Sequence, residues 1–284
     1  MEVIESCKSV QEKSESFRRK GHTIALVPTM GFFHQGHIEL MKVGRKHSDK
    51  LIVSIFVNPM QFGPAEDFET YPRDLDGDLA KAREIGVDVV FAPSVGEMYP
   101  EGFQTKVVVE KVTRNLCGKS RPGHFDGVAT VVAKLFHLTK PHLAIFGQKD
   151  YQQLTVISRM VKDLSMDVQI IGLRTVREPD GLAMSSRNSY LSPEERKSAL
   201  CLKKSLNLAH RMFQEGETDA REIRSAMEKL IREHPFTEIE YVSVCNPVTL
   251  EEIDRAGKDS LVALAVKVGT TRLIDNCIIG RGPS

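Results

Sequence analysis

The chain has 284 residues, of which 41% are hydrophobic and 27% charged, and its 39 basic and 38 acidic side chains leave a formal net charge of +1. This composition is typical of a soluble globular protein that is long enough for one large domain or two smaller ones. A balance so close to zero provides no field to attract nucleic acid or an anionic membrane, so we expect neither as a partner.

Over the first 176 residues, short apolar strands alternate with amphipathic helices. Nearly all-apolar strands are typical of a parallel sheet that is covered on both faces. We therefore predict an α/β fold with a doubly wound parallel sheet. The predicted strands are 23–27, 51–57, 88–93, 143–146 and 168–176, with 107–109 at an edge. The predicted helices are 3–20, 73–86, 124–138 and 150–164, together with one that begins near residue 38.

The pattern changes near Arg177. Pro179-Asp180-Gly181 indicates a turn, and Ser192-Pro193-Glu194-Glu195 predicts a helix start with a capping box. Two amphipathic helices, over 202–213 and 223–231, and three strands, near 239–244, 261–268 and 272–279, complete the chain. We predict two domains, a larger one at 1–176 and a smaller α+β domain at 177–284.

The segment between Val27 and Ile38 has the pattern of a strand, a glycine-containing turn and a helix start. In that geometry, backbone N–H groups at the helix start point toward an anion. His34 and His37 stand three residues apart at this turn, with Gly36 between them, where a bulky ligand can approach the backbone. The turn is therefore a candidate phosphate site. A second interpretation is that both histidines are polar residues in the first turn of a helix, because a short His-x-Gly-His match is weakly specific.

Polar and basic residues also follow the other predicted strands. Ligands of an open α/β sheet bind beyond the carboxyl ends of its strands, so we expect these residues at one edge of the sheet. Their gathering there is more informative than any single motif. The residues are Asn58 and Gln61 after 51–57; Gly147, Gln148, Lys149 and Asp150 after 143–146, with Gln153 in the next helix; and Arg177 with Met184, Ser185, Ser186 and Arg187 after 168–176.

Each of these residues also has a structural interpretation. Lys149 near a helix start either pairs with a phosphate as a point charge or lies solvated at the surface, and Asp150 is also a suitable helix N-cap. Ser185, Ser186 and Arg187 either offer hydroxyls and a forked guanidinium to a phosphate or form an ordinary Ser-rich linker.

The amides of Gln61 and Gln153 are able to hydrogen-bond a carboxylate or hydroxyl without adding a second strong charge, although surface glutamines are common. Arg121-Pro122-Gly123-His124 is either a loop that closes over an anion or a rigid turn before a helix.

Two common nucleotide-binding fingerprints are missing. Gly118-Lys119-Ser120 resembles the end of a P-loop, but that motif requires a glycine five positions before Gly118, where Thr113 stands. No Gly-x-Gly-x-x-Gly follows any predicted strand. If a nucleotide binds, we expect it at the histidine turn and the Ser-Ser-Arg segment.

The five cysteines are scattered, without a Cys-x-x-Cys pair, which argues against a disulfide framework or a zinc site and favours a reducing compartment. The N-terminal residues lack the apolar centre of a signal peptide, and no apolar run approaches the ~20 residues needed to cross a bilayer. We therefore expect a cytoplasmic protein in which the cysteines are buried structural thiols.

Several blocks together closely resemble the pantothenate synthetase (pantoate–β-alanine ligase) family of the His-x-Gly-His nucleotidyltransferase superfamily. The resemblance runs over nearly the whole chain, with the blocks in the family's order. It departs at Gln148, where the family usually has glutamate, and at Gln35, where it often has an acid. The blocks are 28–37, 54–62, 71–73, 121–125, 146–154, 180–188 and 272–276.

The resemblance implies ATP-dependent ligation of (R)-pantoate to β-alanine through a pantoyl adenylate, on a Rossmann-like ATP- and pantoate-binding catalytic domain at 1–176 with a lid domain at 177–284. It also implies a homodimer and Mg²⁺, whose ligands it leaves unknown. Asp78 is a candidate ligand only because it follows Tyr71-Pro72-Arg73.

The resemblance also implies the residues of the site. His34, His37, Lys149 and Arg187 would be catalytic. The implied ATP site is Met30, Gly31, Phe32, Phe33, His34, Gln35, Gly36, His37, Gly147, Gln148, Lys149, Asp150, Val176, Met184, Ser185, Ser186 and Arg187, and the implied pantoate site is Gln61, Gln153, Val131 and Val132.

Two alternatives remain open. Another His-x-Gly-His adenylyl transferase, one that makes dinucleotides or charges a tRNA, shares the turn, although the near-zero charge counts against tRNA. A nucleotide-sensing protein with the fold but no turnover is the alternative from a different class.

Overall fold

The computed structural model describes residues 1–64 and 66–284. The chain forms two compact units. The first unit comprises Met1–Val109, Arg121–Gln148 and Val156–Leu173, and the second comprises Glu110–Ser120, Lys149–Thr155 and Arg174–Ser284. The second unit therefore contains all of residues 177–284, the three residues directly before them, and two earlier segments of the chain.

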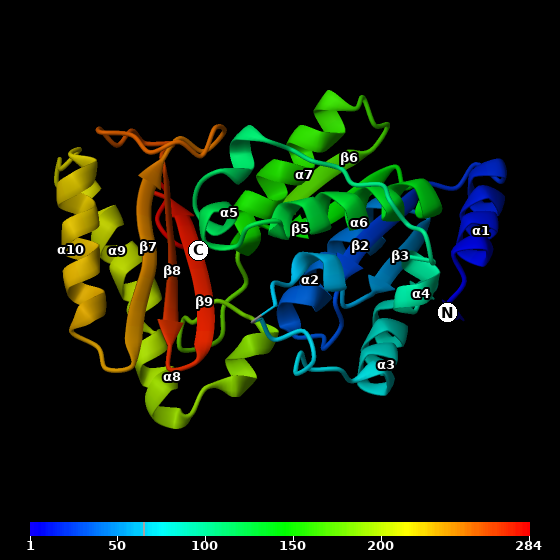
Figure 1. The fold of residues 1–284 in the computed structure, drawn as a ribbon, viewed down its shortest axis with the longest axis horizontal. Coiled ribbons are helices and arrows are strands. Elements are labelled where there is room, and N and C mark those ends of the chain that lie inside the picture. Colours follow the sequence, from blue (N-terminus) through cyan, green and yellow to red (C-terminus); the bar gives the residue numbers. More distant parts are fainter. Residues whose placement is uncertain (65) are drawn as a thin grey trace. The chain divides into compact units, whose positions relative to one another are not determined.

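The first unit is built on a six-stranded sheet in which every pairing is parallel (Figure 1). The strand order is β1-β4-β3-β2-β5-β6, so the order reverses where β2 and β5 lie side by side. This arrangement confirms the predicted doubly wound sheet. In such sheets the ligand site lies at the carboxyl ends of the strands at the reversal point. The strands are β1 (Glu2–Ile4), β2 (Ile24–Thr29), β3 (Lys50–Ile55), β4 (Val89–Phe91), β5 (Leu143–Gly147) and β6 (Gln169–Leu173).

Helices pack against this sheet through apolar side chains. Leu26, Ile52 and Ile145 in the central strands are fully buried, as expected for strands covered on both faces. Met41 of α2 belongs to the same core as Val27 and Val53. The helices and 3₁₀ turns of this unit are α1 (Cys7–Arg19), α2 (Gln35–His47), η1 (Pro59–Gln61), α3 (Leu75–Ile85), α4 (Val95–Met98), α6 (His124–Thr139), η3 (Gln148–Asp150) and α7 (Tyr151–Asp163). Two of them, η3 and α7, belong partly to the second unit.

Three sequence predictions for this unit are wrong in detail. Residues 2–4 form an edge strand on β4 rather than the start of a helix, because three residues are too few to show a strand period. Residues 107–109 are not a strand, and the Val107 N–H donates to Thr130 Oγ1 at 3.0 Å instead of to a neighbouring strand. β6 ends at Leu173 rather than Val176, whose carbonyl accepts a hydrogen bond from the N–H of Met184.

The second unit is a three-stranded antiparallel sheet with helices on one face, which confirms the predicted α+β pattern. Leu206 of α9 and Ile223 of α10 pack with Val266 of β8 in its core. The predicted capping box is present, since Ser192 Oγ accepts from the Glu195 N–H and Glu195 accepts from the Ser192 N–H. The elements are η2 (Lys111–Thr113), α5 (Cys117–Ser120), η4 (Ser186–Tyr190), α8 (Pro193–Ala199), α9 (Cys201–Gln214), α10 (Ala220–Arg232), β7 (Thr237–Cys245), β8 (Leu261–Val268) and β9 (Thr271–Ile278).

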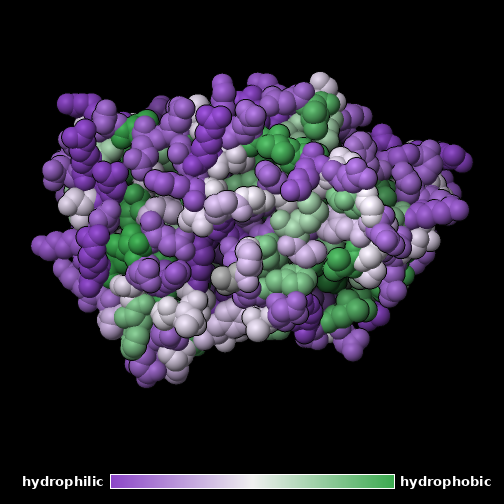
Figure 2. Space-filling model, in the orientation of Figure 1, coloured by the Kyte–Doolittle hydropathy of each residue, from purple (hydrophilic) through white to green (hydrophobic). Residues whose placement is uncertain are grey.

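Hydrophilic residues dominate the visible surfaces of α1 and α10 (Figure 2). Within the described part of the chain, none of the helices has the length and apolar character needed to cross a membrane.

Candidate active site

The histidine turn joins the carboxyl end of β2 to the start of α2, and both imidazoles shape it. His34 is the N-cap of α2, and its Nδ1 accepts the Gly36 N–H at 3.1 Å. His37 Nδ1 accepts the His34 N–H at 3.3 Å, and the two rings stack with centroids 4.1 Å apart. Because a backbone N–H only donates, each neutral ring carries its own proton on Nε2. His34 therefore caps the helix and His37 lies in its first turn, close to the second interpretation, and each ring also carries an Nε2–H group.

Asp78 of α3 supports the same turn. Its two carboxylate oxygens accept the backbone N–H groups of Phe32 at 2.7 Å and Phe33 at 2.6 Å. The turn needs this support because Gly31 and Phe32 both have positive φ, at +86° and +53°, and Phe32 adopts that conformation at a steric cost. Burial raises the pKa of Asp78 despite the two backbone donors. From the sequence, Asp78 is only a candidate magnesium ligand, whereas its contacts show a carboxylate that holds the turn.

The carboxyl ends of β2 and β5 bring two predicted ATP-binding segments to one edge of the sheet. The strands pair in parallel, with Ala25 opposite Leu143. Residues 30–37 follow β2. Gly147 is the last residue of β5, and Gln148 follows it. Since parallel neighbours end at the same edge, these segments lie at the reversal point of the strand order.

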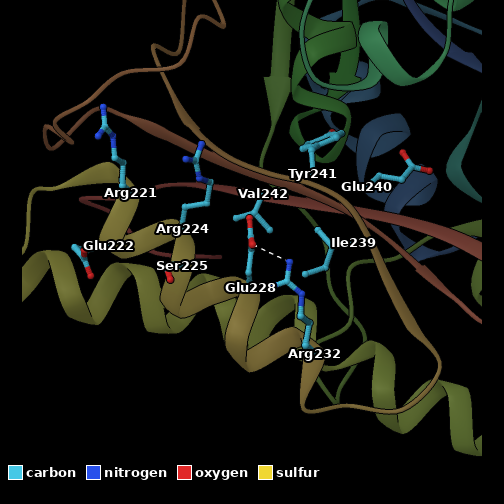
Figure 3. A pocket seen from close by; sticks show the side chains of 10 residues that line it. All are labelled: Arg221, Glu222, Arg224, Ser225, Glu228, Arg232, Ile239, Glu240, Tyr241 and Val242. Carbon is cyan, nitrogen blue, oxygen red and sulfur yellow. Dashed lines mark hydrogen bonds and ion pairs between the residues drawn. The ribbon is translucent and has the colours of Figure 1, made fainter.

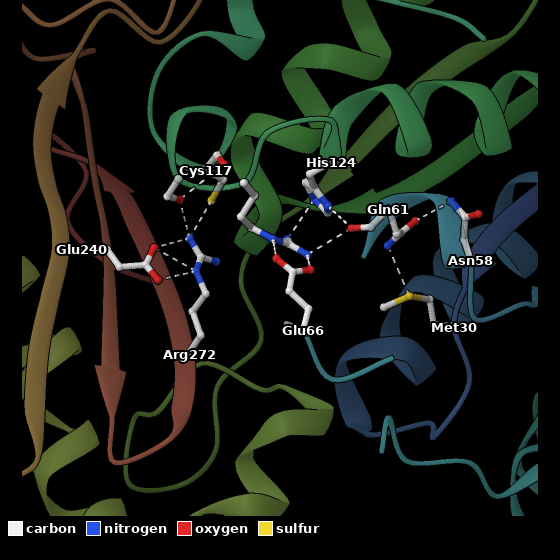
Figure 4. A network of polar contacts seen from close by, with 10 residues as sticks. Met30, Asn58, Gln61, Glu66, Cys117, His124, Glu240 and Arg272 are labelled. Atoms are coloured by element: carbon white, nitrogen blue, oxygen red, sulfur yellow. Dashed lines mark hydrogen bonds and ion pairs between the residues drawn. The ribbon is translucent and has the colours of Figure 1, made fainter. Parts of the chain in front are cut away.

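Gln61 lies in η1, beyond the carboxyl end of β3, and its amide is oriented by a buried network (Figure 4). Asn58 Nδ2 donates to Gln61 Oε1 at 3.0 Å and to the Gly127 carbonyl at 3.1 Å. Asn58 Oδ1 accepts from the Met60 N–H at 3.3 Å and from the Tyr99 hydroxyl at 2.8 Å. The backbone groups of Met60 and Gly127 fix which end of the Asn58 amide is which. Gln61 must therefore turn its oxygen toward Asn58 and its NH₂ away from it.

The NH₂ group of Gln61 lies 3.3 Å from Met30 Sδ, beside the histidine turn. The structure thus brings a predicted pantoate residue next to a predicted ATP residue within the first unit. An amide that presents two N–H donors suits a ligand with carboxylate or hydroxyl acceptors.

Helix α6 packs against η1 at very short range. A Cβ on Gly127 would lie 2.3 Å from the Met60 carbonyl oxygen, so only glycine allows this approach. Val131, one helical turn further on, is 6% exposed, and Val132 is 4% exposed. The predicted apolar wall of the pantoate site is therefore on the helix that buttresses Gln61.

The Arg121–His124 segment also contacts η1. Arg121 pairs with Glu66 through Nη2 at 2.6 Å and Nε at 2.6 Å, and its Nη2 donates to the Gln61 carbonyl at 3.3 Å. His124 Nδ1 lies 2.7 Å from the same carbonyl oxygen (Figure 4). The segment is thus tied to the backbone of Gln61 at the start of α6.

In the second unit, Lys149 is half-buried in η3, directly before α7. Its carbonyl accepts a hydrogen bond from Asn276 Nδ2 at 2.8 Å. Gln152 Nε2 donates to the carbonyls of Val112 and Asn115, at 3.0 and 2.8 Å. These contacts fix the backbone on which Lys149 and the predicted pantoate residue Gln153 stand.

The Ser-Ser-Arg segment is a capped 3₁₀ turn rather than an ordinary linker. Ser185 Oγ accepts the Arg187 N–H at 3.3 Å at the start of η4. Asn188 Nδ2 donates to Glu178 Oε1 at 2.6 Å and to the Ala183 carbonyl at 3.1 Å. The Met184 N–H donates to the Val176 carbonyl at 2.9 Å, which brings these two predicted ATP residues together.

The predicted site residues are thus divided between the units. The first unit carries the histidine turn with Gly147, Gln148, Gln61, Val131 and Val132. The second carries Lys149, Asp150, Gln153, Val176 and residues 184–187. Their convergence on one triphosphate stays a prediction.

The five cysteines, all within the described residues, are free. Four of them are buried, as expected, whereas Cys7 is only half-buried. Burial raises the pKa of Cys201, Cys245 and Cys277 to about 12. Cys117 Sγ lies 3.1 Å from the Tyr241 hydroxyl. It also lies 3.5 Å from Nη2 of Arg272, which pairs with Glu240 at 2.9 Å (Figure 4).

A separate hollow of about 610 Å³ lies between α10 and β7 (Figure 3). Its charged side chains have both signs, and Arg232 pairs at 2.9 Å with Glu228, one turn earlier on the same helix α10. The hollow therefore shows no preference for an anion. Its lining residues are Arg221, Glu222, Arg224, Ser225, Glu228, Arg232, Ile239, Glu240, Tyr241 and Val242.

Comparison with known proteins decides the family. The sequence profile of pantoate-beta-alanine ligase matches residues 2–278. The chain belongs to the pantoate–beta-alanine ligase family. Among its relatives, the pantothenate synthetase of Syntrophus aciditrophicus strain SB is 56% identical over 280 residues, covering 99% of this chain and 98% of that one. The pantothenate synthetase of Geobacter sulfurreducens is 57% identical, with 99% of each chain covered.

Solved structures of pantoate–beta-alanine ligases share the fold. The pantothenate synthetase from Thermus thermophilus superposes with a TM-score of 0.93 at 43% identity, covering 98% of this chain and 99% of that one. The ligase from Francisella tularensis, crystallised with beta-gamma ATP and beta-alanine, gives a TM-score of 0.81 at 34% identity, with 100% of both chains covered.

The sequence did not predict the supporting roles of three residues of this ligase. Asp78 holds the histidine turn, Asn58 orients Gln61, and Asn276 holds the backbone of Lys149. Asp78 did leave a signal, since it lies one helical turn before buried Ala82 and so falls on the inward face of α3. For Asn276 the chain offered only its place in the 272–276 block.

Proposed function

We infer that this chain condenses (R)-pantoate with β-alanine to give pantothenate, while ATP is converted to AMP and diphosphate. The observation that carries this function is the histidine turn at the carboxyl end of β2, next to the oriented amide of Gln61. One feature offers donors to phosphate oxygens, and the other offers donors to an acid.

The reaction has two steps. A pantoate carboxylate oxygen attacks the α-phosphorus of ATP, the bond to the bridging oxygen breaks, and diphosphate leaves. The β-alanine amine then attacks the acyl carbonyl of the pantoyl adenylate, loses a proton, and AMP leaves. Neither step needs a nucleophile from the enzyme. The chain's task is to orient two anions and to stabilise the charge that develops on the phosphoryl oxygens.

His37 is assigned the central catalytic role. Its Nδ1 accepts the His34 N–H, so its Nε2–H is the donor for a phosphate oxygen at the start of α2. His34 has the same tautomer and supports it. The positive end of the α2 dipole adds to the stabilisation of the anion. The adjoining residues 30–33, Gln35 and Gly36 would complete this part of the ATP site.

Charge for the rest of the triphosphate would come from Lys149 and Arg187. A lysine serves as a point charge, and the guanidinium serves as a two-pronged donor. Ser185 and Ser186 would add hydroxyl donors. Gly147, Gln148, Asp150, Val176 and Met184 would line the remaining ATP site.

Pantoate would bind at Gln61 and Gln153, with Val131 and Val132 against its gem-dimethyl group. Gln61 is supported for this role because its NH₂ points away from Asn58 and toward the histidine turn. Neutral amides orient the acid without holding it as tightly as a second cation would. Gln61 would also contact β-alanine.

Mg²⁺ would enter with ATP. Among the side chains that the structure describes, no three or more His, Cys, Asp and Glu residues gather as a metal site. At a nucleotide site, Mg²⁺ takes most of its ligands from phosphates and water and few from the protein. When bound, Mg²⁺ shields the charge of the leaving diphosphate. Both carboxylate oxygens of Asp78 already accept backbone N–H groups of the turn. The residues that would bind Mg²⁺ are therefore left unassigned.

Three further proposals concern the protein as a whole. Residues 177–284 would act as a lid that keeps water from the adenylate. The enzyme would be a homodimer. It would work in the cytoplasm, where its five free thiols stay reduced.

The deciding experiment is incubation with ATP, Mg²⁺, pantoate and β-alanine, with AMP and pantothenate measured by chromatography and mass spectrometry. We expect AMP and pantothenate in equal amounts. We expect no AMP when pantoate or β-alanine is omitted from a full turnover assay. Release of diphosphate without AMP would favour a dinucleotide-forming transferase. ATP binding without any product would favour a nucleotide sensor.

A further inference from the structure

We propose that Asp275 and Asn276 of strand β9 are positioning residues for the ATP site, because they hold the two backbone segments that carry Lys149 and Ser185–Arg187. The proposal rests on the phosphate-binding roles assigned above to those segments. It also accounts for the 272–276 block, which the proposed chemistry does not otherwise use.

One strand is able to hold two segments because successive side chains of β9 point to opposite faces of the sheet. Leu273 and Cys277 belong to the core beneath the helices, so Asp275 lies on that same face. Arg272 and Asn276 lie on the other face. The dipeptide 275–276 thus reaches to both sides of β9.

On one face, Asn276 holds Lys149 through its main chain. Asn276 is 9% exposed, and its Nδ2 donates to the Lys149 carbonyl at 2.8 Å. A hydrogen bond to this carbonyl fixes the peptide between Lys149 and Asp150, and with it the adjoining Lys149 Cα that carries the side chain. The contact does not depend on the Lys149 side chain, so the two residues can be varied separately.

On the other face, Asp275 holds Arg177 in a two-pronged ion pair. Arg177 Nη1 lies 2.7 Å from Asp275 Oδ2, and Nη2 lies 3.1 Å from Oδ1. The side chains are 7% and 1% exposed, so solvent screens the pair little. Arg177 Nη1 also donates to the Gly181 carbonyl at 3.2 Å.

Arg177 begins the hairpin that leads to the Ser-Ser-Arg turn. Arg177 and Ala183 form an antiparallel bridge, and η4 starts three residues after Ala183. A planar guanidinium held at both terminal nitrogens has one orientation, which sets the direction of this hairpin. Asp275 Oδ1 also accepts the Asn276 N–H at 2.8 Å, which links the two holding contacts to each other.

The functional consequence follows from the geometry that phosphoryl transfer requires. Cations stabilise the transition state only where they are held in place beforehand, and a misplacement of about 1 Å costs roughly 100-fold in rate. Loss of either holding contact removes none of the residues proposed to bind ATP, but it loosens the segment that carries Lys149 or the one that carries Ser185–Arg187. We therefore expect the ATP-dependent step to suffer, and the β-alanine step to change little.

The test compares Asn276→Ala and Asn276→Asp with the wild-type enzyme. Asn276→Asp keeps the shape but turns a carboxylate toward the Lys149 carbonyl. For both variants we expect kcat/KM for ATP and the rate of diphosphate–ATP exchange to fall by about tenfold to 100-fold. The KM for β-alanine should stay within about twofold. Wild-type values for ATP in both folded variants would overturn the proposal.

Asn246→Ala is the matched control. Asn246 caps a turn in the same unit, where its Oδ1 accepts the N–H groups of Val248 and Thr249 at 2.8 and 3.1 Å. It contributes to local structure without bonding either ATP-binding segment. We expect its kinetics to match the wild type, so equal losses in Asn246→Ala and Asn276→Ala would reduce Asn276 to a merely structural residue and overturn the proposal.

Lys149→Ala separates failure of this inference from failure of the proposed site. If Lys149→Ala keeps wild-type exchange, the phosphate-binding role of Lys149 is wrong. If Lys149→Ala loses exchange while the Asn276 variants keep it, only the positioning role is wrong. If Asn276 acts through Lys149, adding Asn276→Ala to Lys149→Ala should cost less than about twofold more.

Two measurements keep the proposal testable should the Asn276 variants not fold. Arg177→Lys keeps the charge but removes one prong, and we expect it to lower kcat/KM for ATP more than that for β-alanine. In the wild-type enzyme, the Asn276 carboxamide protons should exchange slowly and shift when a non-hydrolysable ATP analogue binds. Rapid exchange without a shift would contradict the assignment.

Discussion

The carboxylate of Asp78 accepts the backbone N–H of Phe33 at 2.6 Å, and thereby couples helix α3 to the turn that precedes α2. Asp78→Asn keeps the shape but places an NH₂ group against one backbone donor. We expect a loss of about 1–3 kcal/mol in the free energy of unfolding, measured by urea denaturation. Diphosphate–ATP exchange should slow as well, since the turn carries His37.

Asp76→Asn is the matched control for this change. Asp76 is exposed in the first turn of the same helix. We expect its stability to stay within about 0.5 kcal/mol of the wild type, as is usual for surface substitutions. Equal stability of Asp78→Asn and Asp76→Asn would show that Asp78 does not hold the turn.

His37→Ala tests the assigned phosphate donor. Removal of one preorganised donor typically lowers the rate by about 100-fold or more, and we expect that loss in adenylate formation. Stability should also fall by about 1 kcal/mol, because His37 closes the capping box with His34. Stopped-flow or quench measurement of the first turnover separates this step from product release.

His47→Ala, in the exposed last turn of the same helix, serves as its control. It should leave adenylate formation unchanged. Adenylate formation by His37→Ala within a few-fold of wild type would refute the catalytic role.

Gln61→Glu tests the acid site. A carboxylate at this position repels the pantoate carboxylate and removes the two N–H donors that Asn58 orients. We expect the KM for pantoate to rise at least about tenfold, the change that corresponds to a lost hydrogen bond of about 1.4 kcal/mol. The KM for ATP should change much less, and both constants come from steady-state kinetics.

Gln11→Glu, on the exposed surface of α1, makes the same chemical change away from the site. Its KM for pantoate should equal that of the wild type. A larger effect on ATP than on pantoate in Gln61→Glu would place this side chain in the wrong subsite.

Gly127→Ala tests the close packing of α6 on η1. The added Cβ would lie 2.3 Å from the Met60 carbonyl oxygen and 2.6 Å from the Gln61 N, so the backbone of η1 has to move. We expect destabilisation of about 1–3 kcal/mol and a higher KM for pantoate. Thermal unfolding and steady-state kinetics measure the two effects.

Gly96→Ala is the control, because a Cβ there meets no atom within 4 Å and the residue lies in α4. We expect it to be neutral or slightly stabilising. If Gly127→Ala were equally neutral, the packing argument for the pantoate wall would be wrong.

The acid stability of the first unit should depend on Asp88. Burial pushes the pKa of Asp88 upward, but hydrogen bonds from the Leu51 N–H, Arg45 and Lys50 outweigh it and hold the pKa below the usual value for an aspartate. A lowered carboxyl pKa contributes stability that is present above the unfolded value and is lost as the pH falls through the folded value.

Asp88→Asn should therefore be less stable than the wild type at pH 7, and the difference should shrink as the pH falls below about 4. Urea denaturation across this range measures it. A difference that stays constant with pH would show that the charge of Asp88 contributes nothing.

Local patterns in the chain sufficed where neighbours in sequence decide the structure. The capping box at Ser192 and Glu195 needs only residues three apart, and the apolar run 51–57 is long enough to mark a buried strand. The same logic placed the histidine turn, because strand, turn and helix start are contiguous. It failed for residues 2–4 and 107–109, whose secondary structure depends on a partner far away in the chain. Residues 2–4 pair with β4, and the Val107 N–H donates to Thr130.

The sequence by itself determined the fold class, the family and the chemical groups available for an adenylating ligase, since these follow from periodicity and from contiguous blocks. Only the tertiary structure decided which supporting side chains hold those groups. Asp78 reaches Phe33 from 45 residues away, and Asn276 reaches Lys149 from 127 residues away. Hydrogen bonds over such separations leave no period in the chain, because it is the packing of whole elements that brings their partners together.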